Sequence, residues 1–312
     1  MASLTKKSLW DTLTEPKYRL FFMILPFIIL VFLLSYLPLR GWLFAFYNYR
    51  PGLPLGSDRF VGFENFRVIL ADQYAVRDII RVMKNTLGMY FIGLVTSPLA
   101  VIFAIFLNEV HILRYRKTVQ TLTTIPNFIS WVLVYSIAFS MFSVDDGFVN
   151  RLLVSLGVIK EGINFLASQE HIWIKMWAWG TWKGLGWGAI IYIAALTSID
   201  QELYEAARVD GAGRFRCMWH ITVPGLLPTY FVLLVMSIAN MVNSGMEQYY
   251  VFQNAMNRSS IEVLDLYVYN QGIVGINYSY SIAIGILKSL ISIALLFVAN
   301  RGSKFIREES IF

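Results

Sequence analysis

Long apolar runs alternate with polar segments along the chain. Six of them approach the about 20 apolar residues that a helix needs to cross a hydrocarbon core roughly 30 Å thick. They cover residues 20–39, 86–107, 128–142 with its flanks, 176–196, 225–243 and 280–300. The pattern predicts an all-α membrane protein with six transmembrane helices.

Basic residues set the expected orientation. Lysines and arginines precede the first run, follow the last, and also follow the second and the fourth. The opposite loops hold basic residues over a longer stretch of chain, including Arg77, Arg81 and Lys84. The positive-inside tendency therefore predicts cytoplasmic termini, and we expect these three residues on a basic helix lying along the outer interface.

Composition agrees with the apolar pattern. Hydrophobic residues make up 57% of the 312 residues and charged residues 15%, and the mean hydropathy of +0.57 is far above that of a soluble domain. We expect a cytoplasmic segment over 1–19, a transmembrane domain over 20–300 with a cytoplasmic loop over 198–224, and a cytoplasmic tail over 301–312. The first run is interpreted as an anchor, because no signal-peptide cleavage site is evident.

The loop 198–224 carries the most specific local signals. Ser198 and Gln201 have the spacing of a capping box, which predicts a helix that begins near Ile199. Asp210 and Gly211 should end this helix, because glycine adopts the left-handed conformation at little steric cost.

A second short helix is expected after this turn. Phe215, Met218 and Trp219 would share one apolar face, and Pro224 would end the helix where the fifth run begins. The loop would then lie as a helix, a turn and a helix across the end of the bundle, an arrangement suited to a groove in another protein.

The fourth run opens with WAWGTWKGLGWG, residues 177–188. One stripe of the predicted helix consists of Gly180, Gly184 and Gly188. Because these residues are small, a neighbouring helix could approach closely along this stripe. The adjacent stripe consists of Trp179, Lys183 and Trp187. Indole faces suit sugar rings, and a lysine can donate to hydroxyls or pair with a carboxylate. We therefore predict that this second stripe lines a substrate path.

Other interpretations of these residues stay open. Trp173 and Trp177 fit an interfacial aromatic belt, and Lys183 could form a structural pair or extend towards the interface. Lys288, in the sixth run, is a further candidate for the path, although a structural role is favoured for it. If both lysines face the path, an acidic sugar becomes more plausible as the substrate than a neutral one.

The sequence offers no catalytic centre. The three histidines are scattered, Cys217 is the single cysteine, and no phosphate-binding loop is present. We expect neither enzymatic activity nor a cofactor in this chain, so energy for transport must come from partner subunits or from an ion gradient. A self-sufficient ion-coupled secondary carrier is the alternative, but acidic residues are missing from the six runs.

The loop 198–224 resembles the EAA loop of permease subunits of bacterial ATP-binding-cassette (ABC) importers. The residues that carry the resemblance are Glu205, Ala206, Ala207, Gly211, Ile221 and Pro224, with Val223 where the family usually has leucine. LPFIILVFLLSYLPLRGWLFAFYNYR, VGFENF and WKGLGWGAIIYIAALTSID extend the resemblance over most of the chain. These segments are similar to maltose-type sugar permeases, in the branch associated with oligosaccharides cut from complex polysaccharides.

The resemblance implies the type I importer permease fold (MetI-like) in a bacterial cytoplasmic membrane. It also implies that the loop contacts an ATPase subunit through Glu205, Ala206, Ala207, Arg208, Asp210, Gly211, Ile221 and Pro224. The implied partners are a second homologous permease, two cytoplasmic ATPase subunits that hold ATP and Mg, an extracytoplasmic solute-binding lipoprotein, an oligosaccharide and membrane lipid. No nucleic acid is expected.

Overall fold

The structure is a computed structural model that describes residues 16–243 and 245–307. Within these ranges the chain is almost entirely helical, and its extended pairing is an isolated bridge between Tyr47 and Phe60. The all-α fold is therefore confirmed for this part of the chain. Of the expected terminal segments, residues 1–15 and 308–312 lie outside the described residues, while 301–307 continue α16.

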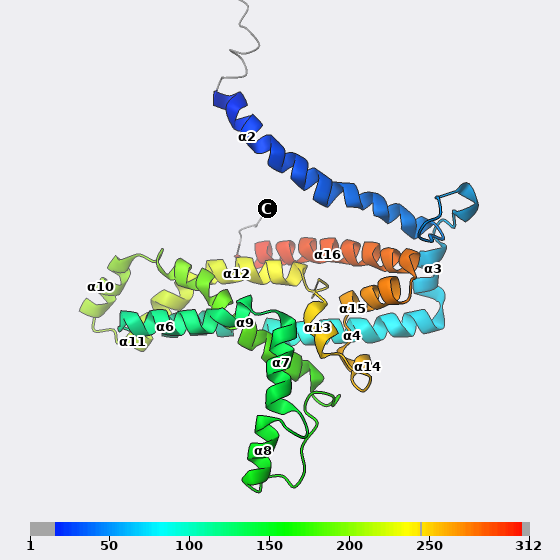
Figure 1. Cartoon of the computed structure of the whole chain (residues 1–312). Coiled ribbons are helices and arrows are strands. Elements are labelled where there is room, and N and C mark those ends of the chain that lie inside the picture. The colour runs from blue at the N-terminus through cyan, green and yellow to red at the C-terminus, as the bar shows by residue number, and fades with distance from the viewer. Residues whose placement is uncertain (1–15, 244, 308–312) are drawn as a thin grey trace, which may run out of the picture.

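Helices follow one another along the chain, with the longest connections between η2 and η3 and between α8 and α9 (Figure 1). The first part of the chain forms α2 (Pro16–Val31), η1 (Phe32–Tyr36), η2 (Leu37–Phe46), η3 (Ser57–Arg59), α3 (Glu64–Ala71), α4 (Gln73–Val95) and α5 (Pro98–Asn108). The middle part forms α6 (Leu113–Thr124), η4 (Ile125–Phe128), α7 (Trp131–Phe142), α8 (Phe148–Ser155), α9 (Ile172–Leu196), α10 (Gln201–Val209) and α11 (Arg214–Cys217). The last part forms η5 (Met218–Thr222), α12 (Val223–Ala239), α13 (Glu247–Phe252), α14 (Arg258–Ile261), α15 (Leu264–Tyr269), η6 (Asn270–Val274) and α16 (Tyr278–Arg307).

Four continuous helices are long and apolar enough to cross a membrane. They are Tyr18–Phe46, Gln73–Asn108, Arg214–Ala239 and Tyr278–Arg301, and the bent pair of α6–η4 and α7 would make a fifth. With 25 residues, α9 has the length of a span, but tryptophans, glycines and two lysines lower the hydropathy of its first half. Four of the six predicted runs are thus confirmed as candidate spans, while the total of six stays a prediction.

The first helix leaves the bundle at a steep angle (Figure 1). The most apolar window of Tyr18–Phe46 is 0% buried within the chain, and contact with the bundle begins at η2, which packs against α16. An apolar helix with so few contacts of its own must be covered by lipid or by another chain.

The second span is interrupted by two turn residues, Thr96 and Ser97, between α4 and α5, with Pro98 in the first turn of α5. At its other end α4 carries the basic residues expected on a separate interfacial helix. That expectation is wrong, because Arg77 and Arg81 lie in the first turns of the same helix that continues to Val95. Its cap, Asp72, accepts a hydrogen bond from the Ala75 amide and fixes this start.

The third predicted span is sharply bent. The axis changes by 105° between Leu113–Phe128 and Trp131–Phe142, and α7 with α8 leaves the bundle steeply (Figure 1). We call the turn at 125–130 the elbow. Ser130 begins α7 as its cap, with its hydroxyl accepting from the Leu133 amide at 3.4 Å, so the chain is locally suited to restart a helix here.

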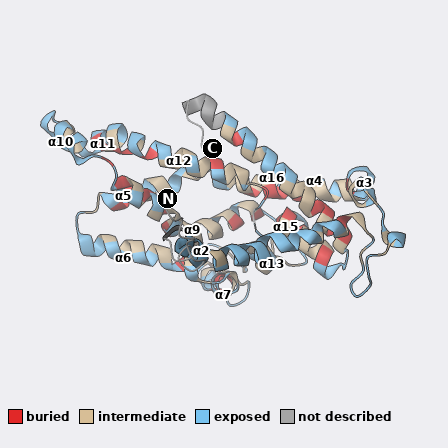
Figure 2. Ribbon diagram, turned by 90° about the horizontal axis from the view of Figure 1, so that it is seen from above, coloured by how far each residue is buried: buried red, intermediate tan, exposed pale blue. Residues whose placement is uncertain are grey.

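Buried residues gather in three clusters along the bundle (Figure 2). One joins η2, α3, α4, α15 and α16, a second joins α4, α7, α9 and α13–α15, and a third joins α5, α9 and α12. The third cluster includes Leu196 and Leu226, which flank the loop 198–224 on both sides, and Ile199 from within the loop. The loop is therefore attached to a packed core of its own.

Candidate functional site

The loop 198–224, hereafter the EAA-like loop, projects at one end of the bundle, opposite α3 (Figure 1). Its first helix, α10, ends at Val209, and Gly211 follows with a φ of +77°. The Gly211 amide donates to the Arg208 carbonyl at 3.1 Å, and the Ala212 amide donates to the Ala207 carbonyl at 2.8 Å. This is the bonding pattern of a Schellman motif, so the predicted role of Gly211 in ending the helix is confirmed.

The start of α10 differs from the expectation. Asp200 caps the helix, since its carboxylate accepts from the Glu202 amide at 3.0 Å, whereas the Ser198 hydroxyl donates back to the Ala195 carbonyl at 2.7 Å. The predicted capping box is therefore wrong. The cause is local, because serine at the end of a helix can bond backwards to its last turn, and this leaves the cap to the next residue with a suitable oxygen.

The second half of the loop is not a separate helix. Residues Arg214–Ala239 form one continuous span in which a π-helical turn, η5, precedes Pro224. The expectation that Pro224 ends a helix is wrong, because proline is tolerated in the first turn of a helical segment and the π turn re-pairs the neighbouring amides. Movement of this part of the loop is thereby transmitted directly to α12.

Both halves of the loop expose apolar and charged side chains. Val209, Phe215 and Trp219 are 88%, 78% and 71% exposed, and Glu205 is also exposed. Met218, expected on the same face as Phe215 and Trp219, instead packs on the third core cluster. A surface that combines large exposed apolar groups with a free carboxylate is typical of an interface with another protein.

The loop is held to the bundle from its inner side. The Tyr204 hydroxyl lies 2.9 Å from the Thr222 hydroxyl and joins the two halves. Gly225 lies against Ile199, whose Cδ1 would be 2.7 Å from a β-carbon added there. These contacts fix the loop on α9 and α12 while its outer side stays free.

Helix α9 leads into the loop and packs against α4, α5, α6 and α12. The expected glycine stripe is only partly involved, since Gly184 has no neighbour within 4 Å of an added β-carbon. The close approach occurs at Gly186, where such a carbon would lie 2.3 Å from the Thr123 carbonyl of α6. The sequence pattern thus found the right helix but missed this glycine.

Lys183 lies one turn before Gly186 and contacts the elbow. Its ammonium donates to the Asn127 carbonyl at 2.6 Å and to the Pro126 carbonyl at 3.3 Å, and it lies 5.5 Å from the ring centre of Trp131. Carbonyls at the end of a helix lack intrahelical donors, and inside a membrane no water replaces them. Lys183 therefore caps the end of α6–η4 from a neighbouring helix.

The remaining predicted path residues lie apart from one another. Trp179 packs edge-on against Phe142 and Trp182, and Trp187 is 50% exposed beside Phe128. The Lys288 ammonium is bonded to the Asp265 carboxylate, and both side chains are 17% exposed. Lys183 and Trp187 both contact the elbow, whereas Lys288 lies on α16, and the contact of all four predicted residues with substrate stays a prediction.

A cavity of about 420 Å³ lies on another side of α9, and we call it the central cavity. Its polar and aromatic lining consists of Tyr90, Ser97, Trp177, Thr181, Ser237, Asn240, Asn243, Gln248 and Tyr249. These residues come from α4, α9, α12 and the segment after α12. The described lining carries no formal charge. Sequence reasoning missed this site because its residues come from distant parts of the chain.

The amides of the central cavity are oriented by the protein. Their NH₂ groups donate to protein oxygens, Gln248 to the Met176 carbonyl at 2.7 Å and Asn240 to the Met236 carbonyl at 2.9 Å. The carbonyl oxygens of these two side chains have no hydrogen-bond partner among the described residues. Burial, with a smaller contribution from Asp265, raises the pKa of Tyr249 to about 12. Its hydroxyl therefore stays protonated, and the cavity offers both acceptors and a neutral donor.

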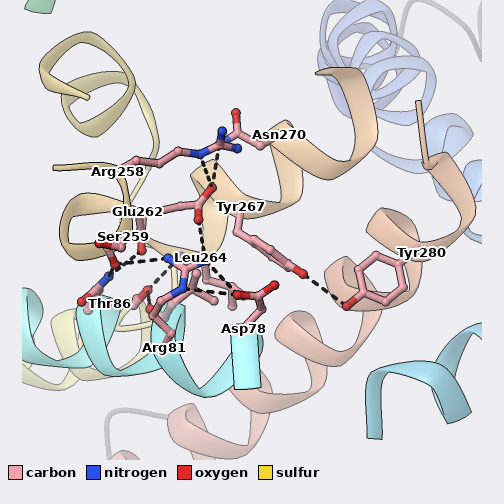
Figure 3. Close-up of polar contacts among 12 residues, drawn as sticks. Asp78, Arg81, Thr86, Arg258, Ser259, Glu262, Leu264, Tyr267, Asn270 and Tyr280 are labelled. Carbon is pink, nitrogen blue, oxygen red and sulfur yellow. Dashed lines mark hydrogen bonds and ion pairs between the residues drawn. The ribbon is translucent and has the colours of Figure 1, made fainter. Parts of the chain in front are cut away.

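A polar network that sequence reasoning did not find joins α4 to α14 and α15 (Figure 3). The Glu262 carboxylate, 3% exposed, accepts from Arg81 at 2.8 Å and from Asn270 at 2.7 Å. The Thr86 hydroxyl accepts from the Leu264 amide at 2.8 Å. These bonds hold α14 and α15 against α4. Because Gln248 and Tyr249 lie in α13, which directly precedes α14, the bonds position these two residues indirectly.

Comparisons with known proteins point to one class of protein. The model of the family "binding-protein-dependent transport system inner membrane component" matches residues 96–307. The chain is 40% identical to the protein LplB of Bacillus subtilis (strain 168), over 97% of this chain and 94% of that protein. It is 39% identical to the polygalacturonan/rhamnogalacturonan transport system permease protein YteP of the same organism, over 98% and 94%. A solved bacterial alginate ABC transporter, in complex with alginate pentasaccharide-bound periplasmic protein, has a chain with a TM-score of 0.84 and 30% identity, over 97% and 99%.

Proposed function

This chain belongs to the family of binding-protein-dependent transport system inner membrane components, and on that basis we propose that it forms half of the path through which an ABC importer takes up an oligosaccharide. The observation that carries the proposal is the EAA-like loop, with its left-handed Gly211 and its exposed outer side. A self-sufficient carrier has no need of such a surface at the end of its bundle.

The proposed complex contains a second, homologous permease, two ATPase subunits that bind ATP and Mg, and an extracytoplasmic solute-binding protein. We place six transmembrane helices in this chain, counting α9 and the bent α6–α7 pair as spans, with both termini in the cytoplasm. The exposed first helix supports an assembly with further chains, because its surface is left uncovered here. ATP hydrolysis is assigned to the partner subunits, which makes this chain a transport subunit and not an enzyme.

In this proposal the outer side of the EAA-like loop lies in a cleft of an ATPase subunit. Glu205 would form charge-assisted hydrogen bonds there, and the exposed Phe215 and Trp219 would supply apolar contact area. Since Arg214–Ala239 is one continuous helix, displacement of the loop would move α12 and with it Ser237 and Asn240 of the central cavity.

We assign the sugar-contacting surface of this chain to the central cavity. Amide oxygens accept hydrogen bonds from sugar hydroxyls, and the faces of Trp177 and Tyr249 suit the apolar side of a pyranose. A volume of about 420 Å³ lies within the range of small-molecule sites. The second permease would supply the opposite wall.

Two of the similar proteins are named for acidic polysaccharides, namely polygalacturonan and alginate. We therefore propose that the substrate is an oligosaccharide cut from a uronate-containing polysaccharide. The two lysines do not support this choice directly, because Lys183 is bonded to backbone carbonyls and Lys288 to Asp265. Selection for the carboxylate would then lie with the binding protein or the second permease.

Two glycine substitutions in the loop test the coupling role. In Gly211→Val the valine is forced to a φ of +77°, whereas in Gly213→Val it meets a permissive backbone and no atom within 4 Å. We expect Gly211→Val to uncouple ATP hydrolysis from uptake of a galacturonate oligosaccharide in proteoliposomes that contain the whole complex and loaded binding protein. Gly213→Val should transport normally, and unchanged uptake by Gly211→Val would refute the role.

The cavity assignment is tested by removing one hydroxyl. Tyr249→Phe keeps the ring but deletes the donor inside the cavity, and Tyr250→Phe is the matched control because that side chain is 49% exposed. We expect uptake at low substrate concentration to fall only for Tyr249→Phe. Equal uptake by the two variants would place the sugar elsewhere.

A further inference from the structure

A second polar cavity, of about 540 Å³, lies beneath the EAA-like loop, and we call it the loop cavity. One wall comes from the connection between α5 and α6, and the other comes from α10 and the turn before α11. Its charged side chains are Glu109, Arg116, Arg208 and Arg214, and His111 lies beside them. With the histidine neutral, three positive charges face one negative charge, which leaves two uncompensated.

One arginine is already used inside the protein. The Arg214 guanidinium donates to His111 Nε2 at 2.7 Å and lies 3.8 Å from the Glu109 carboxylate. The single carboxylate of the cavity is thereby engaged with Arg214.

The other two arginines are free of such partners. Among the residues that the structure describes, neither the Arg116 nor the Arg208 side chain has a hydrogen bond or an ion pair. Arg116 is partly buried and Arg208 is exposed, and both line the loop cavity. A guanidinium without an acceptor among the described residues is available to a planar or tetrahedral oxyanion.

We propose that the loop cavity binds a phosphate group between Arg116 and Arg208. Guanidinium groups match phosphate oxygens bidentately, and the excess of two positive charges balances a phosphate dianion. The volume exceeds that of inorganic phosphate, so the group belongs to a phosphorylated small molecule or to the headgroup of an anionic lipid. The site includes Arg208, which the resemblance also assigns to the ATPase contact, and it does not depend on the proposed substrate.

Binding there restrains the loop. Arg116 belongs to α6 and Arg208 to α10, so a shared phosphate ties the EAA-like loop to the helix that ends at the elbow. Any movement of α10 relative to α6 must then break these contacts. The bound anion slows the transport cycle, which makes the site inhibitory.

The test measures binding of inorganic phosphate to the nucleotide-saturated complex in phosphatidylcholine nanodiscs by ³¹P NMR line broadening. We expect Arg116→Gln to weaken binding at least about tenfold, the loss of one charged hydrogen-bonding partner, and Arg116→Lys to give an intermediate affinity. Arg114→Gln is the matched control, because this exposed arginine of α6 lies outside the cavity. The difference between the variants separates the loop cavity from phosphate sites on the ATPase subunits.

A second arm distinguishes the sources of the phosphate. If a lipid headgroup occupies the cavity, phosphatidylglycerol in the nanodiscs lowers the apparent affinity of the unmodified complex for inorganic phosphate, and if a soluble molecule occupies it, the affinity is unchanged. Either result supports the site. Equal phosphate affinity of Arg116→Gln and the unmodified complex, with both showing the same melting temperature, overturns it, whatever the transport assay shows.

Discussion

The contact between α9 and α6 gives a sharp stability prediction at Gly186. A methyl group at this position, in Gly186→Ala, would lie 2.3 Å from the Thr123 carbonyl oxygen, whereas ordinary contact begins at 3.4 Å. The carbonyl must therefore retreat by 3.4 − 2.3, or about 1.1 Å. If the elbow moves with α6, the bond between Lys183 and Asn127 lengthens from 2.6 Å to about 3.7 Å, which is beyond hydrogen-bonding distance.

The expected loss follows from three contributions. Overpacking at a helix contact costs about 1–3 kcal/mol, and losing a charged hydrogen bond costs about 1.5–3 kcal/mol. The higher helix propensity of alanine offsets about 1 kcal/mol of this loss in stability. The free energy of unfolding should fall by about 1.5–5 kcal/mol, which at about 2 °C per kcal/mol corresponds to a melting temperature lower by about 3–10 °C.

The assay is thermal unfolding of the protein in lipid nanodiscs. Gly184→Ala is the matched control on the same helix, since an added β-carbon meets no atom within 4 Å, and we expect it to be neutral or slightly stabilising. Lys183→Met combined with Gly186→Ala should be less destabilising than the sum of the two, because both changes act on one contact. A stable Gly186→Ala, or an equally unstable Gly184→Ala, would refute the reasoning.

Three further predictions follow from polar contacts of single side chains. Asp200→Ala should destabilise α10 by about 1 kcal/mol through loss of its cap, while Ser198→Ala should not, as measured by hydrogen exchange of the loop amides. Lys288→Met should cost about 3 kcal/mol by leaving the Asp265 carboxylate unpaired, and combining it with Asp265→Leu should restore most of the melting temperature. Thr86→Val should lower the free energy of unfolding, measured by denaturant titration, by about 1–3 kcal/mol, because a buried backbone amide of α15 loses its acceptor. If one of these three measurements shows no change, the corresponding contact is contradicted.

Features decided by neighbouring residues could be predicted from the sequence. Apolar length located four candidate spans, and Gly211 could be assigned to a left-handed turn because the Schellman pattern involves only the preceding helix. The start of α10 shows the limit of this approach. Ser198 and Asp200 both carry a suitable oxygen, and which one caps the helix depends on where α9 ends.

Features decided by distant residues could not be predicted. The elbow depends on Lys183, which is 56 residues from Asn127 along the chain. Helical periodicity groups Gly180, Gly184 and Gly188 but does not say which side of α9 meets α6, and the close contact occurs at Gly186. The central cavity was missed for the same reason, since Tyr90, Trp177 and Gln248 meet only after the bundle packs.

The exposed first helix divides the chain into two cooperative units. From Tyr18 to Tyr36 almost every side chain is exposed, with Leu25 an exception, so its backbone hydrogen bonds are protected by the surrounding lipid and not by tertiary packing. Melting of the bundle would leave this helix intact, and its unfolding would contribute nothing to the main transition. Hydrogen exchange in detergent should therefore show one level of amide protection in this helix and a different, independent level in the bundle. Association with other chains would make the two parts unfold together.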